Sequence, residues 1–146
     1  MKEKLLISAC LLGIGCRYDG CRVSKIDALA LSEKFDLIPI CPEIYGGLPT
    51  PRTPSERIGE RVVMKDGTDV TENFVRGMEH TLDIAHACGA KIALMKAKSP
   101  SCGKGEIYDG SFSGRLTEGN GFTVDHLLAE GFAVYTEADI DKLLSK

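Results

Sequence analysis

The chain has 146 residues, the size of one ordinary domain and short for two. Hydrophobic residues make up 43% and charged residues 27%, which argues against a disordered or fibrous chain. The 18 Lys and Arg and 21 Asp and Glu residues give a formal net charge of −3. This balance lacks the basic footprint of a nucleic-acid-binding protein, so we expect no nucleic acid polymer as a partner.

The sequence also argues against a membrane partner. It has no run of about 18 apolar residues, the length that a membrane-spanning helix needs. The N-terminal segment 1–20 resembles a signal peptide at first sight, but glycine and charged residues interrupt it from Gly13 onward. A strand fits this segment better, and we therefore expect a cytoplasmic protein.

Strand and helix patterns alternate from the N-terminus. A short apolar run predicts a buried strand over Lys4–Ala9, and helical spacing predicts a helix over Ser24–Lys34, capped by its first residue. A strand pattern over Asp36–Ile40 contains Pro39, which weakens the pattern or places the strand at a sheet edge. Four of the six prolines fall in segment 41–60, which we expect to be an irregular loop.

The middle of the chain contains the strongest helix signal. Segment 61–70 predicts a small hairpin that turns at Asp66-Gly67. Apolar residues at helical spacing then predict a helix over Thr71–Cys88, closed by Gly89. A third strand is expected over Lys91–Lys96.

The last third continues the alternation. A glycine-rich loop over 98–121 leaves room for a hairpin around Asp109-Gly110. It is followed by a helix over Thr123–Glu130 capped by Thr123, a strand over Phe132–Thr136 and a helix over Glu137–Leu144. The whole pattern predicts a single α/β domain over 1–146. Its architecture is a three-layer sandwich around a mostly parallel sheet of about four strands, with long Gly/Pro-rich loops.

Cysteine usage is the first sign of function. The six cysteines are too few for a disulfide scaffold of this length, and no export signal is recognised. In a reducing compartment, such thiols are metal ligands, cluster ligands or catalytic groups, with buried small hydrophobic residues as the alternative. Their positions in the predicted fold therefore matter more than their number.

Three of these cysteines follow three predicted parallel strands. Cys10 comes just after the first strand, Cys41 just after the second, and Cys102 in the loop after the third. The carboxyl ends of parallel strands lie at one edge of a sheet, where ligands of open α/β sheets bind. We therefore expect these three thiols to converge on one site.

Three thiolates leave one coordination position open. A zinc ion with three protein ligands, or an iron–sulfur cluster with one iron lacking a protein ligand, can use that position to bind a substrate. No compact CxxC spacing favours a zinc ribbon or a ferredoxin. Glu43 and Ser101 stand beside two of the cysteines and are candidates for acid–base catalysis, with ordinary loop roles as the alternative.

The remaining candidates are weaker. Arg17 and Arg52 can donate directed hydrogen bonds to a substrate, or brace loops. Cys16 is either a spare thiol near the metal site or a small packed residue, and Cys21 is given no role. Two further sets of residues are expected to be structural: Cys88 in the core, and His80, His86 and His126 on helix faces.

Four stretches of the chain resemble a family of small bacterial proteins whose characterised members are thiouracil desulfidases. They are SACLLGIGCRYDG, CPEIYGGLPTPRTPSE, KAKSPSCGKGEIYDGSF and GFTVDHLLAEGFAVYTE, and the resemblance runs nearly the whole chain. It implies a [4Fe-4S] cluster with three cysteine ligands, matched here by Cys10, Cys41 and Cys102. The fourth iron is open to the sulfur of a thiocarbonyl. Glu43 and Ser101 match the acid–base residues.

The implied reaction is a non-redox desulfurisation in which 2-thiouracil and water give uracil and hydrogen sulfide. The implied partner is a small thiolated nucleobase or another thioamide, and the chain can be a monomer or a homodimer. Such a cluster can be lost or replaced in a sample prepared in air. Two alternatives stay open: a non-enzymatic structural or sensing module that holds zinc or a cluster, and a sulfurtransferase that works through a low-pKa cysteine persulfide.

Overall fold

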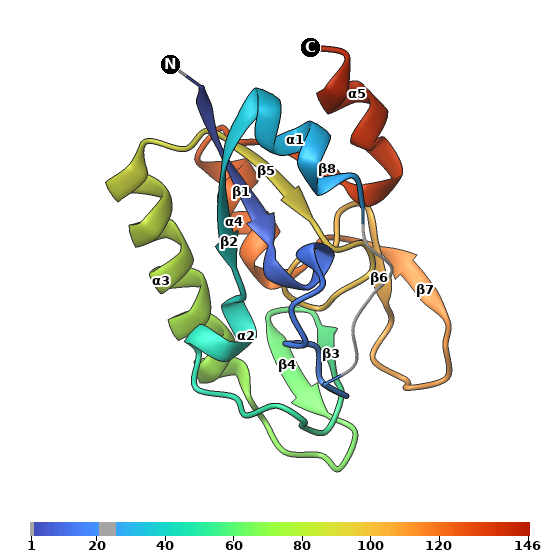
Figure 1. The fold of residues 1–146 in the computed structure, drawn as a ribbon. Helices are drawn as coiled ribbons and strands as arrows, with labels where there is room; N and C mark the ends of the chain where they lie inside the picture. The colour runs from blue at the N-terminus through green and yellow to red at the C-terminus, as the bar shows by residue number, and fades with distance from the viewer. Residues whose placement is uncertain (1, 21–25) are drawn as a thin grey trace.

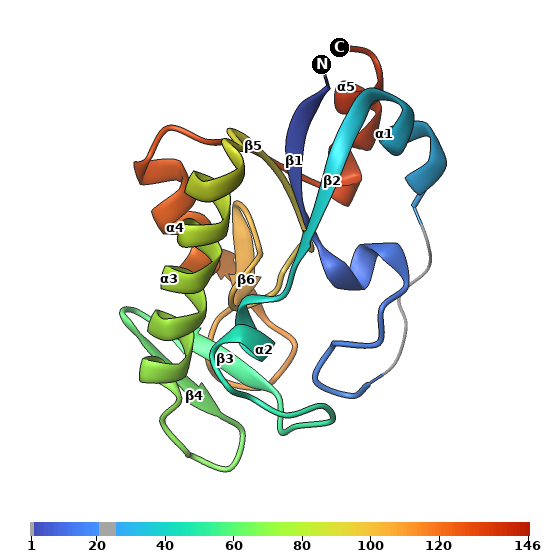
Figure 2. The ribbon, with the colours of Figure 1, turned by 60° about the vertical axis from the view of Figure 1, so that its left-hand side comes forward.

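The computed structural model describes residues 2–20 and 26–146 and shows helices on both faces of a central sheet (Figures 1 and 2). The strands are β1 Glu3–Ser8, β2 Phe35–Ile40, β3 Ser55–Ile58, β4 Arg61–Met64, β5 Ile92–Met95, β6 Glu106–Tyr108, β7 Leu116–Glu118 and β8 Ala133–Thr136. The α-helices are α1 Ala28–Lys34, α2 Pro42–Tyr45, α3 Thr71–Cys88, α4 Phe122–Ala129 and α5 Ile140–Leu144. Two 3₁₀ turns, η1 Ala9–Leu12 and η2 Glu137–Asp139, precede α1 and α5.

The central sheet is four-stranded, in the order β2-β1-β5-β8, and all its pairs are parallel. This confirms the predicted α/β class and the parallel sheet of four strands. Strand β2 lies at an edge, which explains why Pro39 is tolerated there: it lacks the N–H that a central strand would need. The first residue pair of β1 and β2 is Glu3 with Phe35, and their last is Ser8 with Ile40.

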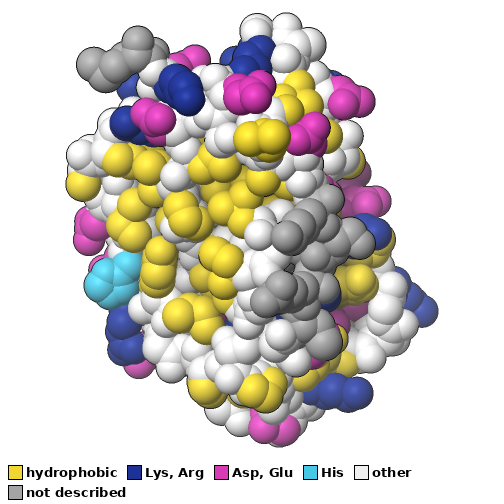
Figure 3. All heavy atoms as spheres, in the orientation of Figure 1, with side chains coloured by type: hydrophobic (Ala, Val, Ile, Leu, Met, Phe, Trp, Pro, Cys, Tyr) yellow, Lys and Arg dark blue, Asp and Glu magenta, His cyan; other side chains and the backbone are white. Residues whose placement is uncertain are grey.

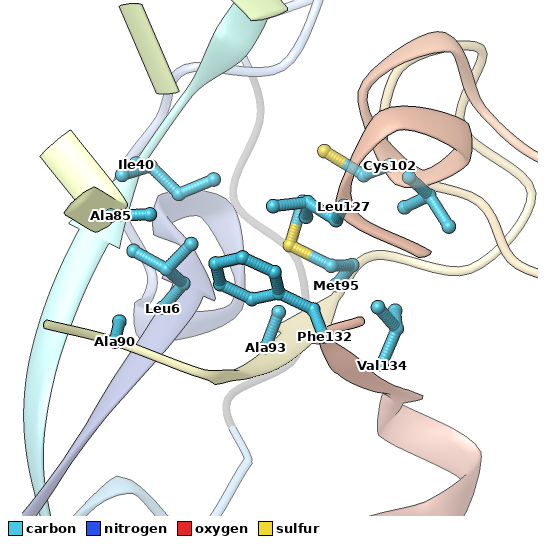
Figure 4. Close-up of a cluster of buried hydrophobic side chains, with 11 residues drawn as sticks. Leu6, Ile40, Ala85, Ala90, Ala93, Met95, Cys102, Leu127, Phe132 and Val134 are labelled. Atoms are coloured by element: carbon cyan, nitrogen blue, oxygen red, sulfur yellow. The ribbon is translucent and has the colours of Figure 1, made fainter. Parts of the chain in front are cut away.

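Side chains at alternate positions of the sheet strands pack into two separate hydrophobic cores. Leu6, Ala93 and Met95 pack under α3 and α4, where Ala85 and Leu127 complete the cluster (Figure 4). The next residue along each strand faces the other way and packs against α1 and α5, as the buried residues Leu5, Ile7, Ile92, Leu94, Leu31 and Leu143 show. The alternation is the expected consequence of the strand period of two.

The two faces of the sheet are covered unequally. Helix α3 has 18 residues and α4 has 8, whereas α1 has 7 and α5 has 5. Figure 3 shows hydrophobic side chains gathered at the surface on the side of β2 and α1. Leu29 of α1 is 72% exposed, and Leu37 of β2 is only partly buried. Some apolar side chains on this side of the molecule are therefore accessible to solvent.

Several boundaries differ from the sequence-based predictions. Helix α1 begins at Ala28 with Asp27 as its N-cap, whose Oδ1 accepts a hydrogen bond from Ala30 N at 3.1 Å; Ser24 lies outside the described residues. The prediction that Thr123 caps α4 is wrong. Gly121 is the N-cap, and Thr123 Oγ1 is buried with no hydrogen-bond partner among the described residues.

The loop predicted over 41–60 contains both α2 and strand β3. Strand β3 pairs with β4, so a hairpin lies earlier in the chain than predicted. The predicted pairing around Asp66-Gly67 is also present in short form, with a bridge between Val63 and Asp69 and hydrogen bonds from Met64 N to Thr68 O at 2.8 Å and from Val70 N to Val62 O at 2.9 Å. The proline and glycine residues of this segment indicated a loop. Proline, however, also occurs at helix starts, and glycine occurs where two backbones approach closely. The hairpin expected around Asp109-Gly110 is confirmed as β6–β7, and α3 spans the predicted Thr71–Cys88.

Helices α2 and α3 cross at glycine positions. A Cβ on Gly77 would lie 1.9 Å from the Pro42 carbonyl oxygen, and one on Gly46 would lie 2.0 Å from the Asn73 carbonyl oxygen. Asn73 Nδ2 also donates to the Gly46 oxygen at 2.9 Å. This backbone contact fixes the position of α2, the helix that immediately follows Cys41.

Replacing Gly77 by Ala tests this contact. A glycine-to-alanine change inside a helix ordinarily stabilises by roughly 0.5–1 kcal/mol. Here the added methyl must displace backbone, so we expect a loss of about 1–3 kcal/mol in the free energy of unfolding, measured by denaturant titration. Glu79→Ala on the exposed side of the same helix is the control, expected to stay within about 0.5 kcal/mol. A Gly77→Ala protein more stable than the parent would contradict the close packing.

Candidate active site

A cavity of about 430 Å³ opens at the carboxyl edge of the sheet. Its size is typical of small-molecule sites, which span roughly 300–1,000 Å³. Cys10, Cys41 and Cys102 all line it, as predicted from their positions after β1, β2 and β5. Because β1 lies between β2 and β5, Cys10 follows the middle strand, with the other two cysteines following its neighbours.

Each of the three cysteines sits at the start of irregular or helical structure. Cys10 lies in the 3₁₀ turn η1 and is 7% exposed, and Cys41 is the N-cap of α2. Cys102 is 5% exposed and forms the margin of the core cluster beside Leu127 (Figure 4). The site is therefore continuous with the packed interior on one side and open on the other.

A fourth thiol joins this set. Cys16 lines the same cavity and shares side-chain hydrogen bonds with Cys10 and Cys41. The sequence left Cys16 open between a packed residue and a spare thiol; the structure places it among the thiols, although it also packs against the α1-side core. Cys21 lies outside the described residues, and Cys88 is half-buried at the end of α3.

The environment favours the protonated form of Cys16, Cys41 and Cys102. The hydrogen bond with Cys16, followed by burial, raises the pKa of Cys41 above its ordinary value. The hydrogen bond with Cys10 is the main reason that the pKa of Cys16 is raised. Burial raises the pKa of Cys102 to about 12, although hydrogen bonds from Ser8 and Ser101 act in the opposite direction. None of these three cysteines therefore offers the low-pKa thiolate that a persulfide sulfurtransferase needs.

The donors at this cavity are thiols, the ligand type of an iron–sulfur cluster. Within residues 2–20 and 26–146, no three His, Cys, Asp or Glu side chains are grouped closely enough to bind one metal ion. The three strand-end thiols instead surround a shared cavity, and cysteine sulfur is the ligand that iron–sulfur clusters use. The zinc form of the structural module therefore finds no single-ion site among the described residues.

Glu43 and Ser101 meet across the cavity. Ser101 Oγ donates a hydrogen bond to Glu43 Oε2 at 2.9 Å, although 58 positions separate the two residues in the chain. Ser101 is 2% exposed, and its hydroxyl also lies 3.5 Å from Cys102 Sγ. The two predicted acid–base residues are thus in direct contact with each other and beside one of the thiols.

Arg52 holds the other oxygen of Glu43. Its Nε and Nη2 reach Glu43 Oε1 at 3.2 and 3.0 Å, and Nη2 also donates to the Cys16 carbonyl oxygen at 3.1 Å. Nη1 donates to the oxygens of Pro49 and Thr50. A guanidinium has five N–H donors, and the five hydrogen bonds of Arg52 give every one of them a partner within the protein. The predicted substrate contact through Arg52 is replaced by a role in positioning Glu43.

Arg17 differs from Arg52 in this respect. It lines the cavity, is partly exposed, and makes no side-chain hydrogen bond or ion pair within the described part of the chain. Its predicted contact with substrate therefore stays a prediction. The carbonyl oxygen of the neighbouring Tyr18 accepts a hydrogen bond from Arg52 N, which links the first loop to the segment after α2.

The loop that carries Ser101 and Cys102 is held by α4. Phe122 N donates to the Pro100 carbonyl oxygen at 2.7 Å, and Thr123 N donates to that of Ser101 at 3.0 Å. A Cβ on Gly121 would lie 2.4 Å from the carbonyl carbon of Ser101, so glycine allows the helix to approach this loop. The first amides of α4 thus fix the position of the loop.

The two small hairpins complete the wall of the cavity, a contribution that the sequence-based analysis missed. Tyr108 and Phe112 come from the β6–β7 hairpin, and Glu56 comes from β3. Glu56 Oε1 accepts hydrogen bonds from Gly110 N at 2.9 Å and Phe112 N at 3.1 Å, which ties the hairpins together. The motif DGSF was visible in the sequence, but nothing in its spacing indicated which residues face the site.

The Arg52–Glu43 pair can be tested by one-sided removal. The side chains are only 3% and 13% exposed, so Arg52→Met leaves a carboxylate with little access to water. We expect a loss of about 3–5 kcal/mol in the free energy of unfolding. The control is Arg61→Met, which breaks the exposed pair with Asp69 and should cost below about 1 kcal/mol. Equal losses in the two variants would show that the Arg52–Glu43 pair is energetically a surface pair.

Comparisons with known proteins agree with this geometry. The family model described as 2-thiouracil desulfurase matches residues 5–139. A solved structure of the [4Fe-4S]-dependent thiouracil desulfidase TudS is 45% identical, with a TM-score of 0.90, over 97% of this chain and 95% of that one. The Bacillus subtilis (strain 168) protein YbbK, described as uncharacterized, is 37% identical over 96% of this chain and 99% of its own length. The chain belongs to the 2-thiouracil desulfurase family.

Proposed function

We propose that this protein removes sulfur from a thiocarbonyl compound such as 2-thiouracil, giving uracil and hydrogen sulfide. The observation that carries the proposal is the meeting of three strand-end thiols with the hydrogen-bonded pair Glu43 and Ser101 in one cavity. The similarity to TudS, a [4Fe-4S]-dependent thiouracil desulfidase, supports the same chemistry here. No helix among the described residues has both the length and the apolar character needed to cross a bilayer.

Cys10, Cys41 and Cys102 would hold a [4Fe-4S] cluster in this cavity. When bound with three cysteine ligands, such a cluster supplies one iron that can act as a Lewis acid toward sulfur. The residues fit this group because their soft thiol donors come from three separate strand ends around a shared space. Cys16 is an additional thiol at this site, beyond the three ligands that we assign.

Glu43 and Ser101 handle the protons of the reaction. Glu43, with one oxygen held by Arg52, accepts a proton from the water that attacks the ring carbon. Ser101 passes a proton to the adjacent ring nitrogen, since it also lines the cavity and its hydroxyl is hydrogen-bonded to Glu43. The water oxygen ends on the carbon as the new carbonyl oxygen. As the C–S bond breaks, the hydroxyl proton on that carbon and the proton placed on the ring nitrogen both move to the departing sulfur, which leaves as hydrogen sulfide. No electron is gained or lost overall.

The aromatic wall fits a flat substrate. Tyr108 and Phe112 line the cavity from the β6–β7 hairpin, and aromatic rings stack on nucleobases with little dependence on their identity. A planar thiolated base is therefore the substrate class that we favour. A ring held on its faces presents its thiocarbonyl edge to one side of the cavity.

The decisive experiment measures sulfide and uracil together. Protein purified and reconstituted without oxygen should release the two products from 2-thiouracil in a 1:1 ratio. Replacing Glu43 by Gln should lower kcat by about 10²–10⁴-fold, because the base is lost, while iron content stays at the parent level. The control Glu79→Gln on the exposed side of α3 should retain parent activity. Iron-loaded parent protein that releases no sulfide would overturn the proposed function.

The iron content of single variants distinguishes the cysteines that hold the cluster from the others. Single Cys→Ser variants at positions 10, 41 and 102 should each lose most of the iron and acid-labile sulfide per chain, measured after anaerobic reconstitution. Cys88→Ser is the matched control, because Cys88 lies at the far end of α3 and does not line the cavity. Full iron in any of the first three variants would remove that residue from the ligand set.

A further inference from the structure

The hydroxyl of Ser99 lies at the centre of three hydrogen bonds beside the catalytic pair. Ser99 Oγ accepts from the backbone N–H of Ser101 at 3.2 Å and from that of Cys102 at 3.1 Å. It also lies 3.1 Å from Ser101 Oγ, and it lines the cavity. Neither the sequence-based assignment nor the proposed mechanism uses this residue.

Counting donors and acceptors fixes the direction of the third bond. A serine hydroxyl has two lone pairs and one proton. The two backbone amides occupy both lone pairs of Ser99, so its proton is the one available for the bond with Ser101. Ser101 in turn donates its own proton to Glu43 Oε2 at 2.9 Å. The hydroxyls therefore form an ordered chain from Ser99 through Ser101 to Glu43.

We propose that Ser99 is a positioning residue that holds Ser101 Oγ in place while Ser101 relays a proton between Glu43 and the substrate. The proposal rests on the proposed function for the identity of that substrate. It concerns the hydroxyl chain and leaves the cluster ligands as assigned. Ser99 itself does not exchange its proton.

The relay balances with Ser99 unchanged throughout. Before proton transfer, Ser101 accepts from Ser99 and donates to Glu43. After Glu43 has taken a proton from water, Glu43 donates to Ser101, and Ser101 gives its own proton to the ring nitrogen. One O–H bond breaks on Glu43 as one forms on Ser101, and one breaks on Ser101 as an N–H bond forms. The bond from Ser99 is the same in both states, so the Ser101 oxygen stays in place while its hydrogen turns from Glu43 to the ring nitrogen.

Substitutions at position 99 separate this role from a structural one. Ser99→Ala removes the donor to Ser101, and we expect kcat to fall about 10–100-fold, the usual effect of losing an outer hydrogen-bond partner of a catalytic group. KM should change by less than about threefold, and iron per chain should match the parent, since the substrate contacts and thiols remain. Ser99→Thr keeps the hydroxyl and should restore kcat. Ser145→Ala, an exposed serine in the C-terminal segment, is the control.

The outcomes distinguish this proposal from the proposed function. An active parent with an equally active Ser99→Ala variant overturns the role of Ser99 and leaves the desulfidase intact. An inactive parent overturns the function, and a neutron structure of deuterium-exchanged protein then tests Ser99 alone. A deuterium between Ser99 Oγ and Ser101 Oγ, bonded to Ser99, supports the ordered chain, and one directed elsewhere overturns it. If Ser99→Ala loses iron, its kcat is no longer comparable with that of the parent, and the same neutron map then tests the role of Ser99.

Discussion

The parallel pairing of β2, β1 and β5 is the constraint on which the site depends. Parallel neighbours end at the same edge of the sheet, so the residues that follow them must come together whatever their separation along the chain. For this reason the same cavity is lined by Cys10, Cys41 and Cys102. An antiparallel arrangement of any one of these strands would send its cysteine to the opposite edge.

The strand ends alone do not set the position of the catalytic side chains. Glu43 sits on the short helix α2, whose place depends on the backbone contact with Gly77 of α3. Ser101 sits in a loop held by the first amides of α4. The bond between Glu43 and Ser101 therefore links two helices on the same face of the sheet through the site. Helix α3 thus contributes to the core through Ala85 and contacts α2 through Gly77.

The charged side chains of the site have most of their hydrogen-bonding positions occupied by other residues of the protein. Arg52 directs all five donors to internal acceptors, so Glu43 has a single oxygen left to face Ser101. Ser99 orders the hydroxyls from the other side. The hydrogen bond with Cys16, together with burial, raises the pKa of Cys41, and burial raises the pKa of Cys102. A positively charged metal centre would therefore be needed to favour these thiolates.

The sequence by itself determined the α/β alternation, the bounds of α3, and the placement of three cysteines after three strands. These features follow from local periodicity and from the rule for parallel sheets, so they need no knowledge of contacts. Only the tertiary structure decided that Cys16 joins the thiols, that Arg52 supports Glu43, and that Ser99 orders Ser101. It also decided that segment 41–60 forms α2 and β3, and that two hairpins wall the cavity. These features depend on hydrogen bonds and close approaches between residues far apart in the chain, for which local sequence carries no signal.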